Sequence, residues 1–278
     1  MKRKATAYTV LTYLCLTFLG LLFFLPVAMM LFGSFKPDDR VLAEAGKLSR
    51  YLLTGMDWDN YGDVFRRVPF LRYLLNSTGI TTVIVLAGLL INSLAGYGLA
   101  RLRWKGRDAI LLLVIALMII PLEAIAVPLF YEVTLLGWRD TYLVQIVPFI
   151  ANAFSIYLFY SFFLGLPREL EEAARMDGAG PWRIFFTIAA PNARPLFATV
   201  AILTFLTQWG GFLWPLMATA SEAVRPLPLG IAAFYTLPPL QWGDIFAFGV
   251  MMVAPVLLLF IFFQKWFVRG VASVGIKG

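Results

Sequence analysis

The sequence predicts an all-α membrane protein with six transmembrane helices. Hydrophobic residues make up 60% of the 278-residue chain, and charged residues make up only 14%. Soluble domains are nearer half apolar and about one quarter charged, so a water-soluble fold could not bury this much apolar surface. The apolar stretches are continuous and do not alternate with polar residues, which favours spanning helices over a β-barrel.

Six apolar stretches are long enough to cross a bilayer, which takes about 20 residues. The first follows a basic start that resembles a signal peptide, but it is too long for the apolar core of one, so we interpret it as an uncleaved span. The connection 34–73 has room for short surface helices, and the four prolines of connection 219–244 argue against a long helix there. The predicted spans are residues 7–32, 74–100, 109–133, 142–164, 195–218 and 245–267.

The distribution of positive charge predicts that both termini lie in the cytoplasm. With six spans, 14 of the 23 Lys and Arg residues fall on the side of the termini. Cytoplasmic connections carry the excess of positive charge, and short loops follow this rule best. The short connection 101–108 is the clearest case, since it contains Arg101, Arg103, Lys105 and Arg107.

The residue types exclude several kinds of chemistry. The chain has no histidine and one cysteine, Cys15, so it has no histidine-based metal site, no histidine acid–base catalysis and no intrachain disulfide. Lys47 is followed by Leu48 rather than Ser or Thr, and no glycine stands five residues before it, so this segment is not a phosphate-binding loop. If transport needs ATP, another chain must bind it. Membrane orientation explains the net charge of +7, and we expect no nucleic-acid partner.

The connection 165–194 is the one large polar segment on the cytoplasmic side, and it predicts a helix–turn–helix. Pro167 suits the first turn of a helix, and the acidic residues Glu169, Glu171 and Glu172 suit its positive N-terminal end. Gly178 can end that helix in the left-handed conformation, and Pro181 can begin a second short helix. On the residues alone, both a docking surface for a partner and an ordinary connection remain open.

The same segment carries a recognisable motif. The pattern Glu172-Ala-Ala-x-x-Asp-Gly-Ala179, followed by Ile188-x-x-Pro191, resembles the EAA motif of binding-protein-dependent ABC transporter permeases. Two departures are Ala190 in place of the usual Leu and Gly210-Gly211 in place of the usual Asn-Glu. The similarity extends over nearly the whole chain, and the tail is similar to that of the MalG subunit of maltose transporters. The other matching segments, typical of the carbohydrate-uptake branch, are 60–65, 76–77, 95–101, 105–107, 209–216, 242–243 and 264–278.

The resemblance implies the permease subunit of an ATP-driven importer for a sugar or sugar-like solute, with an importer of a glycerol phosphate ester or polyol as the alternative. Residues 1–278 would form a single permease domain, with residues 165–194 as its cytoplasmic EAA coupling loop between spans four and five. The subunit would be non-catalytic, because ATP hydrolysis would take place on a separate chain. The implied ATPase-coupling residues are Glu172, Ala173, Ala174, Asp177, Gly178, Ala179 and Pro191.

The resemblance also implies a set of partners. ATP and Mg would bind a dimeric ABC ATPase, and this chain itself would bind no cofactor. A second, related permease of the MalF type would complete the membrane path. An external solute-binding protein would dock on segments 34–73 and 219–244. The location would be the lipid bilayer of a bacterial or archaeal inner membrane.

Glu123 is the sharpest candidate for the solute path. It lies in the third span between Pro121 and Pro128. Ionisable residues in spans usually face a cavity or a partner, although Glu123 could instead reach the outer interface. An ion-coupled secondary transporter would need more such carboxylates and inverted repeats, of which the sequence offers little. A membrane scaffold without transport is the third possibility.

Three further residues are candidates for the path, each with a competing structural role. Asn92 shares one helix face with Gly88 and Gly96, which favours helix packing over contact with the solute. Tyr157 and Trp209 could stack on a sugar ring, but packing or lipid contact is the commoner role of such aromatic residues.

Overall fold

The computed structural model describes residues 2–44, 46–52 and 55–275, and every regular element in these ranges is helical. The all-α prediction is therefore confirmed. The chain divides into two compact units, residues 1–71 with 230–255 and residues 72–229 with 256–278. That residues 1–278 form a single permease domain stays a prediction. In chain order the elements are α1 (Lys2–Gly33), α2 (Asp38–Ala43), η1 (Leu48–Tyr51), α3 (Asp59–Arg67), α4 (Phe70–Arg101), α5 (Arg107–Leu117), α6 (Leu122–Leu135), α7 (Tyr142–Ile150), α8 (Ala153–Leu164), α9 (Arg168–Met176), α10 (Pro181–Ile184), η2 (Phe185–Ala189), α11 (Ala190–Asn192), α12 (Arg194–Trp209), α13 (Leu213–Ala218), α14 (Leu227–Phe234) and α15 (Trp242–Gly275).

Four helical segments are long and apolar enough to cross a membrane. They are Thr9–Gly33, Phe70–Arg101, Tyr142–Leu164 and Trp242–Gln264. Two bent pairs qualify only if each is taken as one span: α5 with α6, at 109°, and Pro181–Asn192 with α12, at 78°. By length and composition, the described part of the chain therefore has four to six candidate spans, where the sequence predicts six.

Three of the predicted spans are interrupted, and the fourth breaks at Ala151 and Asn152, between α7 and α8. The third breaks between α5 and α6, where Pro121 has no N–H to donate and its ring disfavours the helical conformation in Ile120. The fifth breaks between α12 and α13, where Gly210 and Gly211 have low helix propensity. A count of apolar residues cannot detect such breaks, because the residues at them are themselves apolar or small.

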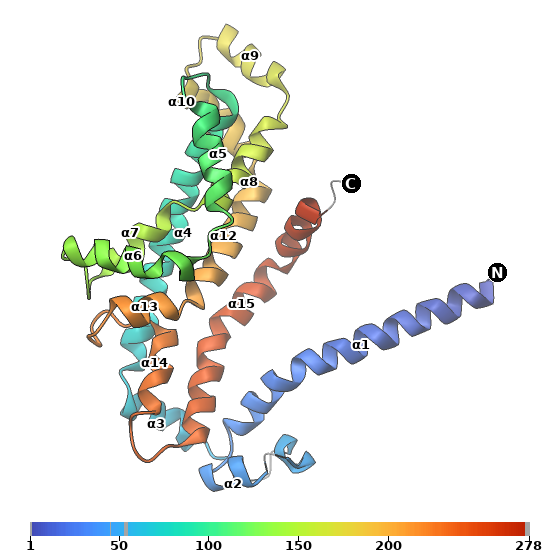
Figure 1. Ribbon diagram of the computed structural model, residues 1–278. Coiled ribbons are helices and arrows are strands. Elements are labelled where there is room, and N and C mark those ends of the chain that lie inside the picture. The colour runs from blue at the N-terminus through green and yellow to red at the C-terminus, as the bar shows by residue number, and fades with distance from the viewer. Residues whose placement is uncertain (1, 45, 53–54, 276–278) are drawn as a thin grey trace. The chain divides into compact units, whose positions relative to one another are not determined.

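Aromatic packing forms the core of the second unit, where α4, α8 and α12 run side by side (Figure 1). The Tyr97 ring meets those of Phe163 and Phe185 edge-on, with centroids 5.6 Å and 5.3 Å away. A Cβ on Gly96 would stand 2.6 Å from the Cβ of Phe159, so only glycine permits this approach of α4 and α8. The buried members of this cluster are Tyr97, Ala100, Phe159, Phe163, Ile184, Phe185, Ala189, Ala193 and Val200.

A smaller cluster joins α6, α7 and α13 in the same unit. Its buried members are Val133, Val144, Trp214 and Ala218. The Trp214 indole donates a hydrogen bond of 2.8 Å to the Val144 carbonyl oxygen, which fixes the ring against α7. Val133 of α6 belongs to the same cluster, so α13 also lies beside the broken third span.

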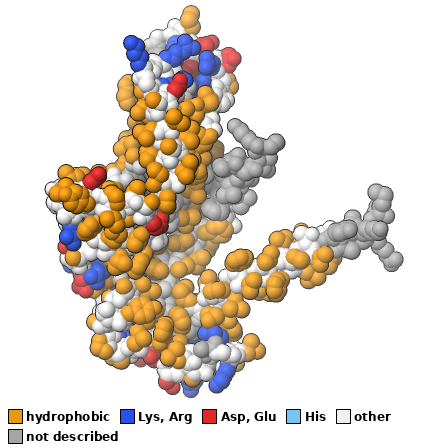
Figure 2. Space-filling model, viewed as in Figure 1, with side chains coloured by type: hydrophobic (Ala, Val, Ile, Leu, Met, Phe, Trp, Pro, Cys, Tyr) orange, Lys and Arg blue, Asp and Glu red, His pale blue; other side chains and the backbone are white. Residues whose placement is uncertain are grey.

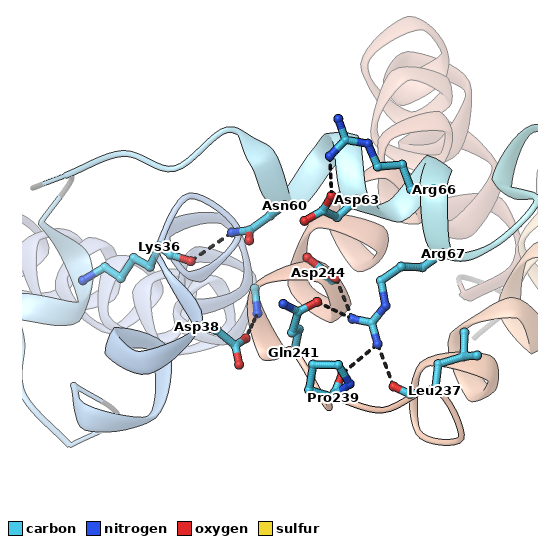
Figure 3. Close-up of polar contacts among 11 residues, drawn as sticks. Lys36, Asp38, Asn60, Asp63, Arg66, Arg67, Leu237, Pro239, Gln241 and Asp244 are labelled. Atoms are coloured by element: carbon cyan, nitrogen blue, oxygen red, sulfur yellow. Dashed lines mark hydrogen bonds and ion pairs between the residues drawn. The ribbon is translucent and has the colours of Figure 1, made fainter.

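In the first unit, Arg67 at the end of α3 clamps the segment that leads into α15 (Figure 3). Its guanidinium lies 2.7 Å from the carboxylate of Asp244 and from the side-chain oxygen of Gln241. It also donates to the carbonyl oxygens of Leu237 and Pro239, both at 2.7 Å. The Asp244 side chain is only 1% exposed, so it is a buried charge whose partner is one guanidinium nitrogen of Arg67.

Candidate functional site

The predicted helix–turn–helix over residues 165–194 is confirmed, and its first helix is α9. Glu169 and Glu171 lie in the first turn of α9, at the end of the helix that favours negative charge. Gly178 has φ +77°, and its N–H donates to the Arg175 carbonyl oxygen at 3.0 Å, so it ends the helix in the left-handed conformation as predicted. The chain can then reverse within a few residues.

The second helix of the motif runs through α10, η2 and α11. Pro181 stands at its first position, as predicted. The middle section, Phe185–Ala189, is π-helical. Pro191 lies inside α11, one residue before the helix ends at Asn192. Because its ring would clash with the carbonyl of residue 187 in a regular helix, the wider π turn accommodates it.

A buried ion pair joins this motif to the end of α4. Arg101 Nε lies 3.1 Å from Glu171 Oε1, and the two side chains are 4% and 7% exposed. The Arg101 guanidinium also donates to the Leu166 carbonyl oxygen. Arg175, one turn along α9, lies 3.5 Å from the other oxygen of Glu171. α9 is therefore fastened to the last residue of a membrane-spanning helix.

Four of the seven predicted coupling residues are exposed on the motif. Glu172, Ala173, Asp177 and Gly178 are exposed, whereas Ala174, Ala179 and Pro191 are half-buried. Large apolar side chains are exposed beside them: Met176 is 89% exposed, Trp182 67% and Phe186 55%. Figure 2 shows Lys and Arg side chains gathered at this end of the second unit. We call the set Glu172, Ala173, Met176, Asp177, Gly178, Trp182 and Phe186 the coupling face.

Exposed apolar groups within a charged surface are typical of a protein docking site. The Trp182 and Phe186 rings stack on one another with centroids 6.4 Å apart and an interplanar angle of 16°. The coupling face therefore combines two exposed, stacked aromatic rings, an exposed carboxylate and a turn that has no side chain at Gly178. The sequence shows that Trp182 and Phe186 are apolar residues in a polar segment, but only the structure shows that they are exposed.

A cavity of about 490 Å³ lies in the second unit and contains Glu123. We call it the helix-break cavity, because the interruptions of three helices meet at it. Its lining combines aromatic rings, amides, hydroxyls and one carboxylate. The lining residues are Ser77, Ile80, Thr81, Ile120, Leu122, Glu123, Ile125, Leu129, Gln145, Pro148, Phe149, Ala151, Asn152, Thr207, Gln208, Gly211, Phe212, Leu213, Trp214, Pro215 and Pro226.

The other three path candidates do not line this cavity. Asn92 is buried and donates to the Ile150 carbonyl oxygen at 3.1 Å, while its own oxygen accepts from the Asn152 N–H at 2.9 Å. It thereby satisfies the backbone at the α7–α8 break, which is a packing role. Tyr157 is half-buried, 6.1 Å from the ring of Tyr160, and Trp209 is buried at the end of α12. A role of these three residues in the path stays a prediction.

The segment after α13 is held by polar residues that the sequence analysis did not single out. Asp140 accepts the N–H groups of Ala220 and Ser221, both at 2.9 Å. These two backbone donors hold the pKa of the Asp140 carboxyl below its ordinary value. Asp140 has φ +57°, a conformation that Asp tolerates better than most residues. In the sequence, Gly137–Asp140 indicates a turn, but no motif identifies Asp140 as functional.

Two other polar side chains hold the same segment to the spans. Gln145 of α7 donates to the Val224 carbonyl oxygen at 2.8 Å. Asn76 of α4 donates to the carbonyl oxygens of Ala223 and Arg225, at 3.0 Å and 2.9 Å. The segment that follows α13 is thus held beside the helix-break cavity, which Pro226 lines.

In the part of the chain that the structure describes, no three His, Cys, Asp or Glu side chains come together as a metal site would require.

Comparison with known proteins places these features in a family. Residues 88–273 match the family model described as "Binding-protein-dependent transport system inner membrane component". The chain is 34% identical to the arabinooligosaccharides transport system permease protein AraQ of Bacillus subtilis, over 98% of this chain and 97% of AraQ. It is 32% identical to the trehalose transport system permease protein SugB of Mycobacterium tuberculosis, over 99% of each chain. A crystal structure of a bacterial ABC transporter that imports alginate has the same fold, with TM-score 0.83, 24% identity and coverage of 95% and 98%.

Proposed function

The chain belongs to the family of inner membrane components of binding-protein-dependent transport systems, and on this premise we propose that it is the permease subunit of an ATP-driven ABC importer for a sugar. Relatives that match nearly its whole length are named as permeases for arabino-oligosaccharides and trehalose, which supports the solute class. Its helices and its family make it a multi-pass inner-membrane protein. The subunit moves a solute and breaks no bond itself.

The coupling face is the observation that carries this proposal. It combines an exposed carboxylate, a turn without a side chain and two exposed aromatic rings on a short helical motif. The buried pair Arg101–Glu171 connects the motif to α4, so a movement of α9 is transmitted to a spanning helix. A separate dimeric ATPase would bind here, with Glu172 facing one of its basic groups, and ATP and Mg would be held by that partner.

The remaining partners follow from topology. The excess of Lys and Arg in connection 101–108 supports a cytoplasmic location for the coupling face and both termini. Segments 34–73 and 219–244 then face outward and would receive the solute-binding protein. A second, related permease would complete the path. The mechanism is alternating access, in which closure of the ATPase favours one of two arrangements of the spans.

The test uses the importer assembled from this chain with the neighbouring gene products, reconstituted in vesicles. We expect uptake of arabinotriose or trehalose that needs ATP and continues when a protonophore collapses the proton gradient. Uptake that survives ATP depletion but stops with the proton gradient would instead establish an ion-coupled transporter. Saturable uptake of sn-glycerol 3-phosphate without uptake of either sugar would establish the glycerol phosphate alternative. Isolation of this chain as an active homo-oligomer would contradict the proposed partners.

A further inference from the structure

Three interrupted helices meet at the helix-break cavity. Ile120 lies in the break between α5 and α6, Ala151 and Asn152 in that between α7 and α8, and Gly211 and Phe212 in that between α12 and α13. In hydrocarbon every backbone N–H and C=O needs a partner, so irregular backbone within a membrane is tolerated only where it is packed in protein or lines a water-filled cavity. In many secondary transporters the substrate site is formed by interrupted helices of this kind.

Polar side chains with unused hydrogen-bonding capacity face this cavity. Gln208 of α12 is half-buried, and no described residue hydrogen-bonds its side-chain amide. Glu123 is exposed on the first turn of α6, and it forms no ion pair with a described residue. An amide and a carboxylate can each bind a pair of neighbouring hydroxyl groups, which is the donor and acceptor pattern of a sugar.

Aromatic rings supply the complementary apolar wall. Phe212 is 41% exposed at the α12–α13 break. Phe149 and Trp214 meet edge-on with centroids 5.9 Å apart, and the indole N–H of Trp214 is already bonded to Val144. Trp214 is therefore a fixed wall, whereas the Phe212 ring is free to pack against the C–H face of a sugar ring. The cavity volume of about 490 Å³ lies within the range of small-molecule sites.

The charge of the cavity restricts its ligand. Among the described lining residues Glu123 is the one charged group, and neither Lys nor Arg lies with it. A carboxylate repels an anionic ligand that has no cation beside it. A phosphate ester or a uronate would have no cation to pair with here, whereas neutral hydroxyl groups would be bound.

We propose that the helix-break cavity is a binding site for a neutral sugar unit of the transported solute, with Glu123 and Gln208 as its hydrogen-bonding groups and Phe212 as its packing surface. This inference rests on the proposed function and narrows it, because it places a solute site within this permease and excludes anionic sugars from it.

The test uses the lone cysteine of the chain. Cys15 is exposed on α1 and can be replaced by alanine, which leaves a cysteine-free background. Gln208→Cys then puts one thiol in the cavity of the complete importer, held in lipid nanodiscs without its binding protein. We expect saturating arabinotriose to slow labelling by a neutral maleimide at least fivefold. Trigalacturonate, which has the same number of rings but carries carboxylates, is expected to leave the rate unchanged.

Thr134→Cys is the matched control, since Thr134 is exposed on α6 but does not line the cavity, and its labelling should not respond to either sugar. Phe212→Cys repeats the measurement if Gln208→Cys does not assemble. In uptake by the complete importer with its binding protein, Gln208→Ala should raise the KM for arabinotriose about 5- to 10-fold, as expected for one lost hydrogen-bonding group.

The outcomes separate this inference from the proposed function. Normal ATP-dependent uptake of arabinotriose together with no protection at either cavity cysteine would overturn the site and leave the function standing. Equal protection by trigalacturonate would overturn the selection by charge. Failure of the wild-type importer to take up any sugar would instead overturn the function itself.

Discussion

Arg101 and Glu171 form a buried ion pair that fastens the end of α4 to α9, with Arg101 Nε 3.1 Å from Glu171 Oε1. The neighbouring Glu172 is exposed. Two adjacent glutamates therefore have different roles, since Glu171 holds the motif in place and Glu172 remains available to a partner. The coupling proposal depends on this division.

Breaking the Arg101–Glu171 pair should loosen the motif. Glu171→Ala leaves the Arg101 charge buried without its carboxylate, and removal of one partner of a buried pair costs about 3–5 kcal/mol. We expect a lower temperature of thermal unfolding in detergent and weaker solute-stimulated ATP hydrolysis. The control is Arg175→Ala, because Arg175 is 54% exposed and its contact with Glu171 is longer. A Glu171→Ala protein as stable as the control would contradict the structural role of the pair.

The Arg67 clamp should stabilise the segment that leads into α15. Arg67→Ala leaves Asp244, which is 1% exposed, without its cation, and the loss should again be about 3–5 kcal/mol. We expect faster proteolysis of residues 237–241 in addition to lower thermal stability. Arg66→Ala is the matched control, because Arg66 is 77% exposed and its pair with Asp63 should contribute only about 0–1 kcal/mol. Equal proteolysis of the two variants would count against the clamp.

Asp140 should make the turn at residues 218–221 sensitive to acid. The backbone N–H groups of Ser221 and Ala220 lower the folded-state pKa of Asp140, so its stabilisation is present above the ordinary carboxyl pKa and is lost as pH falls through the lowered value. Asp140→Asn keeps a residue that tolerates positive φ but removes the charge. The wild type should unfold at a higher temperature than Asp140→Asn at pH 7, and the difference should shrink below about pH 4. A difference that does not change with pH would rule out this assignment.

Gly96 should be required for the contact between α4 and α8. A methyl group added there meets Phe159 Cβ at 2.6 Å and the Tyr160 backbone nitrogen at 2.8 Å, so Gly96→Ala should reduce the yield of folded protein. Gly98→Ala is the control on the same helix, because its added Cβ has no neighbour within 4 Å and alanine favours the helix by about 1 kcal/mol. Size-exclusion chromatography of the two variants tests this. Normal folding of Gly96→Ala with a changed KM for solute would favour a path role for this face instead.

Local signals in the sequence predicted much of the coupling motif. Pro181, Gly178 and the acidic first turn of α9 act through backbone conformation and the helix dipole, which depend on neighbours within one or two turns. The side chains that fasten the motif could not be predicted in the same way. Arg101 meets Glu171 across some 70 residues of chain, and nothing local distinguishes Glu171 from Glu172. The contact of Asn92 with the α7–α8 break is also long-range, so the sequence could not predict it. The sequence does show that Asn92 is a polar residue on a face that favours packing.

The helix-break cavity shows the other limit. The sequence identifies Glu123 as a candidate for the solute path, because a carboxylate within a membrane span is energetically costly. The structure places Glu123 in the lining of a cavity. The sequence does not identify Gln208 as a path residue, because an amide near the end of an apolar run can have many structural roles. Only the convergence of three breaks, which lie far apart in the sequence, gives Gln208 its place beside Glu123.

The central claim is that the coupling face passes ATPase movement to the spans, and solute-stimulated ATP hydrolysis by the reconstituted importer tests it most directly. Gly178→Val forces a branched side chain into φ +77°, and Glu172→Lys reverses the exposed charge, so both should abolish the stimulation while membrane insertion stays normal. Gly180→Ala is the matched control, because Gly180 has φ −76° and open space at its Cβ, and it should keep wild-type stimulation. Full stimulation in Gly178→Val and Glu172→Lys would contradict the claim.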